Sequence, residues 1–148
     1  MLPHLVLIPL VAGIGTQVIK FIIQIVRGEF AWSRLQEYGG MPSAHTAFVV
    51  SLAVTVGLHL GWDSAEFAIS LIFALLIIRD AIGLRQFLSQ HGKILNMLIK
   101  DLPDDVERKY PHHLEERFGH TPLQALVGGL IGLVVALWLH DVVPDWWP

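Results

Sequence analysis

Four long apolar segments, separated by polar connections, constrain this chain more than any other feature of its sequence. They cover residues 4–26, about 42–60, about 65–78 with an extension towards 88, and 122–140. Hydrophobic residues make up 53% of the chain and charged residues only 16%, whereas soluble domains carry about 25% charged residues. A helix needs about 20 apolar residues to cross a bilayer. The sequence therefore predicts an all-α bundle of about four transmembrane helices, forming one integral membrane domain over residues 1–148.

The second and third segments are the weakest part of this prediction, because they reach spanning length only when their polar ends are included. A soluble protein with very apolar helices is the alternative. The long polar connection, residues 89–120, contains an amphipathic pattern with apolar residues at helical spacing: Leu88, Ile94, Leu95, Leu98, Ile99 and Leu102. This pattern predicts an additional amphipathic helix that lies on the membrane or on the bundle.

The charged residues predict how the bundle is oriented. The chain has ten Lys and Arg residues, and a four-span topology places all of them except Lys20 in the two connections on one side. By the positive-inside rule that side is cytoplasmic, so both termini lie outside a plasma membrane of bacterial type. The net charge of −3 gives no sign of nucleic-acid binding, and the absence of cysteine excludes thiolate metal sites. A homodimer is left open.

One polar motif, Gly39-Gly40-Met41-Pro42-Ser43-Ala44-His45-Thr46, joins the first two apolar segments. Its glycines permit a tight turn, and proline is favoured in the first turn of a helix. Ser43 and His45 are therefore predicted in the first turn of an apolar helix, where free N–H groups and the helix dipole favour an anion. The alternative is an ordinary turn followed by a helix cap.

The same topology brings other polar residues to the face that carries this motif. They are Lys20 late in the first segment, Arg79, Asp80 and Arg85 at the end of the third, and His120 at the start of the fourth. Cations and helix N-termini can hold the oxygens of a phosphate ester, while one imidazole attacks phosphorus and another protonates the leaving group. The sequence therefore predicts a phosphate site at this face.

Three stretches of the sequence resemble a known family. They are the motif at residues 39–46, Asp80-Ala81-Ile82-Gly83-Leu84-Arg85 with Ile94-Leu95-Asn96, and Gly119-His120-Thr121-Pro122-Leu123. Together they are similar to the type-2 phosphatidic acid phosphatase superfamily, which includes vanadium haloperoxidases, and in particular to its divergent branch of small membrane proteins. The resemblance implies a helical bundle and a phosphohydrolase that needs no metal or other cofactor.

The resemblance also implies roles for individual residues. His120 would be the nucleophile that forms a phosphohistidine, and His45 would be the general acid. The residues that would bind phosphate are Lys20, Ser43 and Arg85, with Arg79 as a further candidate. The implied substrate is a lipid phosphate or an isoprenoid pyrophosphate in the cytoplasmic leaflet, for instance one of the phosphatidylglycerophosphate type.

The chain departs from the superfamily pattern at several positions. Ala44 replaces a glycine, and Leu114 stands where an arginine is expected. Gln124 stands where an acidic residue would orient the nucleophilic histidine, and an amide can fix the tautomer of the ring but supplies no counter-charge. Either Asp80 or Glu116 supplies that charge instead, or turnover is slow or absent.

Two further possibilities follow from these departures and from the other histidines. A bundle that holds an anionic lipid headgroup without turning it over is the main alternative to an enzyme, and Gln124 is the residue that favours it. A metal site built from His112, His113 and His120 lacks the usual ligand spacing and is not expected. The other histidines are expected to be residues at the membrane interface or in loops rather than ligands: His4, His59, His91, His112, His113 and His140.

Overall fold

The computed structural model describes residues 2–28, 40–110, 114, 116 and 119–142, and within this part of the chain every regular element is a helix. The helices are α1 (Leu2–Val26), α2 (Ala44–Leu60), α3 (Ala65–Ile82), α4 (Leu84–Lys100), the short α5 (Asp104–Glu107) and α6 (Pro122–Val142). The predicted all-α fold is confirmed.

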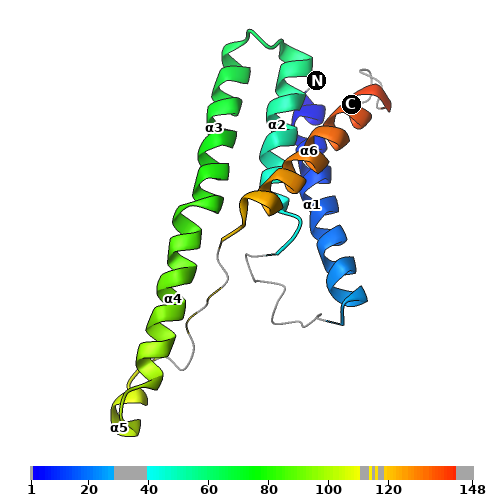
Figure 1. Ribbon diagram of the computed structural model, residues 1–148. Coiled ribbons are helices and arrows are strands. Elements are labelled where there is room, and N and C mark those ends of the chain that lie inside the picture. Colours follow the sequence, from blue (N-terminus) through cyan, green and yellow to red (C-terminus); the bar gives the residue numbers. More distant parts are fainter. Residues whose placement is uncertain (1, 29–39, 111–113, 115, 117–118, 143–148) are drawn as a thin grey trace.

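Helix α2 lies at the centre of the bundle, with α1, α3 and α6 packed around it (Figure 1). Two glycines of α6 allow this helix to approach the backbone of α2 closely. A Cβ atom at Gly128 would collide with the carbonyl oxygen of Ser43, and one at Gly132 would collide with that of Ala47. This close packing fixes the start of α6 beside the start of α2.

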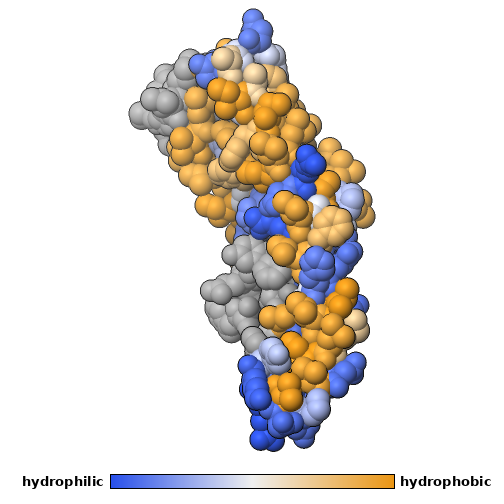
Figure 2. Space-filling model, turned by 90° about the vertical axis from the view of Figure 1, so that its left-hand side faces the viewer, coloured by the Kyte–Doolittle hydropathy of each residue, from blue (hydrophilic) through white to orange (hydrophobic). Residues whose placement is uncertain are grey.

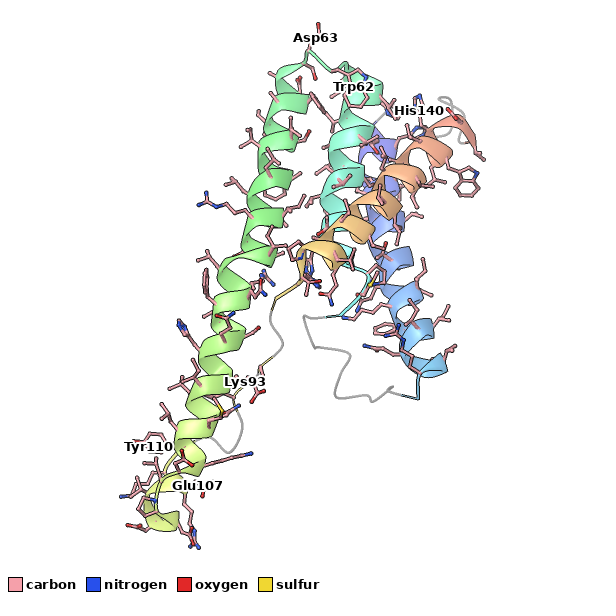
Figure 3. All side chains as sticks on the ribbon, viewed as in Figure 1. Trp62, Asp63, Lys93, Glu107, Tyr110 and His140 are labelled. Atoms are coloured by element: carbon pink, nitrogen blue, oxygen red, sulfur yellow. The ribbon has the colours of Figure 1, made fainter. Side chains whose placement is uncertain are left out.

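Serine caps define where two of the helices begin. The Ser43 hydroxyl accepts hydrogen bonds from the backbone N–H and the hydroxyl of Thr46, at 3.3 and 2.9 Å, at the start of α2. The Ser64 hydroxyl accepts from the N–H of Phe67, at 3.1 Å, at the start of α3. Trp62, in the tight turn between α2 and α3, packs edge to face on Phe67 at the end of the bundle away from α4 (Figures 1 and 3).

Three stretches of the described chain are long and apolar enough to cross a membrane: His4–Val26, Ala65–Lys100 and Pro122–Val142. Helix α2 is shorter, with 17 residues, and much of it is buried among the other helices. Large apolar side chains are exposed along α1, α3 and α6, which suits contact with lipid chains. The chain is therefore a membrane protein whose outer helices shield a central one.

The third span differs from the prediction in its length. Helix α4 begins at Leu84, directly after α3, and continues along the axis of α3 beyond the rest of the bundle (Figure 1). The amphipathic helix predicted within residues 89–120 thus exists but starts earlier, and it neither folds back onto the bundle nor turns away from α3. The physical reason is that Gly83 interrupts the helix for a single residue without redirecting the chain.

Candidate functional site

The segment before α2 turns sharply and is tied to α6. Gly40 has a φ angle of +105°, which side chains other than glycine rarely adopt, and the Met41–Pro42 peptide bond is cis. The backbone N–H of Ser43, a completely buried residue, donates to the carbonyl oxygen of Gln124 at 3.2 Å. The two helix N-termini that the sequence predicts at one face therefore lie next to each other.

Lys20 reaches this turn from α1. Its side chain is 5% exposed, and a Cβ atom at Gly40 would lie 3.0 Å from its Cε and 3.6 Å from its Nζ. Glycine at position 40 thus serves both the backbone conformation and the close approach of the lysine. A buried ammonium group in an apolar bundle is stable only beside polar or anionic partners.

His120 is fixed at the junction of α3 and α4. Its backbone N–H donates to the carbonyl oxygen of Ala81 at 3.0 Å, and the N–H of Gly119 donates to the Ser89 hydroxyl at 3.3 Å. A Cβ atom at Gly119 would lie 2.7 Å from the backbone nitrogen of Gln86, so this contact also requires glycine. The segment before α6 is consequently held against the side of α4.

A cleft lies where these elements meet, and six residues line it: His45, Ile77, Asp80, Ala81, Arg85 and His120. The structure thus brings together four of the residues predicted for the phosphate site, from α2, α3, α4 and the segment before α6. Ser43 is buried at the start of α2 and does not line the cleft. Arg79 is exposed on α3 and is also absent from the lining.

Asp80 and Arg85 form an ion pair at the edge of this cleft. The Nε atom of Arg85 donates to Oδ2 of Asp80 at 2.7 Å, and both side chains are a little more than one third exposed. The pair bridges α3 and α4 across Gly83. Of the two acidic residues proposed to replace the missing orienting carboxylate, Asp80 is therefore engaged with the arginine.

The other acidic candidate, Glu116, is engaged with α4. Asn96 donates from Nδ2 to the Glu116 carboxylate at 2.7 Å and to the carbonyl oxygen of Leu114 at 2.8 Å, and its Oδ1 accepts from the N–H of Leu114 at 2.9 Å. Asn96 lies seven residues beyond Ser89, which is about 10 Å along a helix. These hydrogen bonds of Asn96 were not predicted from the sequence, although Ser89, Gly92 and Asn96 are small or polar residues at helical spacing.

His120 is buried, with 5% of its surface exposed, and its Nδ1 atom has no hydrogen-bond partner among the described residues. This burial lowers the pKa of His120 below the ordinary histidine value, and the nearby charges of His45 and Lys20 lower it further, while Gln124 and the backbone of Gly40 act in the opposite direction. The imidazole is therefore neutral at pH 7, as a nucleophile must be.

Gln124 has a structural role that the sequence prediction missed. Its side-chain oxygen accepts from the N–H of Thr121 at 2.9 Å, and its own N–H donates to the Thr121 hydroxyl at 3.3 Å. These reciprocal bonds form a capping box at the start of α6. The spacing of Thr121 and Gln124 is the usual sequence signal for this motif, so it could have been recognised.

Three histidines meet at the opposite end of the bundle. The rings of His4 on α1 and His59 on α2 are 5.6 Å apart, and those of His59 and His140 on α6 are 4.9 Å apart, both edge to face. His140 lies at the end of α6, at the same end of the bundle as Trp62 (Figure 3). The contacts between these three rings were not predicted from the sequence. No group of three His, Cys, Asp or Glu residues in the described chain is placed to hold a metal ion, and His112 and His113 lie outside that part.

Two comparisons with known proteins found a match. A family described as the Divergent PAP2 family matches residues 3–135. The chain is also 38% identical over 139 residues to an uncharacterized membrane protein, YuiD, of Bacillus subtilis (strain 168), covering 86% of this chain and 88% of that protein. No solved structure matches.

Proposed function

Because this chain belongs to the Divergent PAP2 family, we propose that it is a membrane phosphohydrolase that acts on a lipid phosphate or an isoprenoid pyrophosphate. One observation carries the proposal. His45 and His120, which are far apart in the sequence, line the same cleft together with Arg85. Two imidazoles and a guanidinium in one cleft can hold and attack a phosphoryl group.

The reaction has two steps in this proposal. A ring nitrogen of His120 attacks phosphorus, forming a P–N bond as the P–O bond to the lipid breaks, and His45 gives its proton to the departing alkoxide. Water then attacks the phosphohistidine, loses a proton to His45, and releases inorganic phosphate from His120. Arg85 and Lys20 balance the charge on the phosphoryl oxygens, and the N-terminus of α2 at Ser43 adds to their field.

The position of the cleft supports a lipid as substrate. It lies where α2 and α6 begin and α3 ends, so a headgroup could reach it while the acyl or isoprenoid chains stay among the exposed apolar side chains of the outer helices. Most Lys and Arg residues fall in the two connections at this end, so the positive-inside rule puts the cleft at the cytoplasmic leaflet. Phosphatidylglycerophosphate is one candidate of this class.

The test is phosphate release by the purified chain in detergent, over a panel of phosphatidic acid, phosphatidylglycerophosphate and isoprenoid pyrophosphates. H120A is expected to lose phosphate release, and Q90A, which changes an exposed residue of α4 away from the cleft, serves as its control. Vanadate should inhibit the wild type, whereas EDTA should leave it active. Full activity in a correctly inserted H120A would refute the mechanism.

A non-catalytic lipid-binding role is the second candidate, and one observation favours it. The side-chain oxygen of Gln124 bonds to Thr121, and the groups that set the pKa of His120 include no carboxylate. A histidine without a counter-charge binds a phosphate more readily than it turns one over. Saturable binding of a lipid phosphate with no phosphate release across the panel would support this role.

A further inference from the structure

Helix α4 carries an apolar face that the described structure leaves uncovered. Six large apolar side chains of this face are between 47% and 67% exposed: Leu84, Phe87, Leu88, Ile94, Leu95 and Leu98. Figure 2 shows an apolar area over α4, separated by polar groups from the apolar surface of α3. An exposed apolar area of this kind in water usually marks an interaction site.

The residues on this face repeat as in a coiled coil. Leu84, Leu88, His91, Leu95 and Leu98 follow one another at alternating spacings of four and three residues. Such spacing places them on one narrow line along a helix, which is the seam through which two parallel helices pack. Phe87 and Ile94 widen the face on one side.

The opposite side of α4 is already occupied. Ser89 and Asn96 hold the segment that leads to α6, through the bonds to Gly119 and Leu114. Together with the ion pair between Asp80 and Arg85, these bonds keep α4 along the axis of α3. Helix α4 is therefore held in a direction that does not allow it to lie flat on the membrane surface.

The length of the combined helix places this face outside the bilayer. The stretch Ala65–Lys100 has 36 residues, which is about 54 Å of helix, whereas the hydrocarbon core is about 30 Å thick. The helices of the bundle end near one another at the level of the turn between α2 and α3. The part of the combined helix that exceeds the bilayer thickness is therefore α4, which projects at the opposite end (Figure 1). Lipid chains cannot cover an apolar face that stands in the aqueous phase.

We propose that a second copy of this chain covers it, the two α4 helices forming a parallel coiled coil. All copies inserted in one bilayer share the same orientation, so their α4 helices project from the same side and point the same way. The heptad spacing of Leu84, His91 and Leu98 provides the seam for this pair, and the shared orientation in the bilayer makes the pair parallel. The inference uses the membrane position of α3 and is independent of the proposed phosphatase activity.

The absence of cysteine makes a direct test available, because any introduced cysteine is the only thiol in the chain. L98C places a thiol on the seam, whereas helical periodicity of about 3.6 residues per turn places K93C on the side of α4 away from the seam. A disulfide needs Cα atoms about 4.4–6.8 Å apart. Because Leu98 lies at one end of the seam, its two copies come this close in a parallel pair but not in an antiparallel pair centred on the same seam. In vesicles at low protein density, oxidation should convert most of L98C to a dimer and leave K93C monomeric.

Two further measurements keep the outcome decisive. L95E/L98E should abolish the dimer of the otherwise unmodified chain in nanodiscs, as measured by single-particle mass, whereas Q90E/K93E should keep it. Equal cross-linking of L98C and K93C would indicate random collision and overturn the proposal. A fluorophore on L98C that is quenched by quenchers on lipid chains, without any disulfide dimer, would show that lipid covers the face and would also overturn it.

Discussion

Replacing Gln124 with glutamate should show whether the missing counter-charge limits catalysis. One carboxylate oxygen of Q124E can keep the bond to the N–H of Thr121, because glutamate is as good a capping-box residue as glutamine. The other oxygen then faces His120, which Gln124 already approaches closely enough to influence its pKa. The substitution thus adds a charge while the local structure is retained.

The size of the effect follows from electrostatics at this distance. An opposite charge within about 4–6 Å shifts a pKa by roughly 1–3 units, and because Gln124 is only half-buried we expect the lower part, about 1–2 units. Each unit corresponds to about 1.4 kcal/mol. The same stabilisation of a cationic phosphohistidine would raise the pH-independent rate of phosphate release about 10- to 100-fold.

The assay is the pH profile of phosphate release for the wild type, Q124E and the control Q90E, in which the same charge is added to an exposed position on α4. Burial lowers the pKa of His120, so the midpoint of the fall in the wild-type rate on the acid side should lie below pH 6.5. In Q124E the pH at which the rate falls on the acid side should be higher by about 1–2 units. The mechanism would be refuted if Q124E had the same melting temperature as the wild type but also the same rate of phosphate release and the same pH profile. His120 would then not be the nucleophile.

Three other substitutions test the frame of the site. G40A should weaken substrate binding and raise KM, because its Cβ would meet Lys20 and its backbone would be strained at φ of +105°. G132V should separate α6 from α2 and destabilise the protein by about 1–3 kcal/mol in detergent unfolding, since a side chain there meets the backbone of Ala47. N96A should cost about 1–3 kcal/mol, because it leaves both backbone groups of Leu114 without a partner.

Much of the fold could be predicted because apolar segments of spanning length leave few alternatives. Alternating spans require that the end of the first helix and the start of the second lie at one face, and this brings Lys20 close to Gly40. The same rule places the first and last residues of the bundle at the other face. His4, His59 and His140 could therefore have been predicted to share one end, although their ring contacts depend on side-chain conformations that the sequence does not encode locally.

The relation of α4 to the bundle could not be predicted in this way. Amphipathic periodicity states which face of a helix is apolar, but it does not state what the face contacts. The direction of α4 is set by long-range bonds, from Asn96 and Ser89 to the segment before α6. These bonds join residues that are 18 and 30 positions apart, and no local pattern links them.

These bonds also explain why a helix outside the bundle matters to the cleft within it. His120 takes its place from two contacts, one from its own N–H to Ala81 at the end of α3 and one from Gly119 to Ser89 on α4. If α4 were to swing away from the axis of α3, the contact between Gly119 and Ser89 would break and the segment that carries His120 would lose this support. A partner that packs on the far side of α4 would favour the straight α3–α4 rod, and hence the arrangement in which His120 faces His45. N96A should lower the population of this arrangement by releasing the segment before α6, and L95E/L98E should lower it by releasing α4. Hydrogen exchange at the N–H of His120 should therefore be faster in each variant than in the wild type.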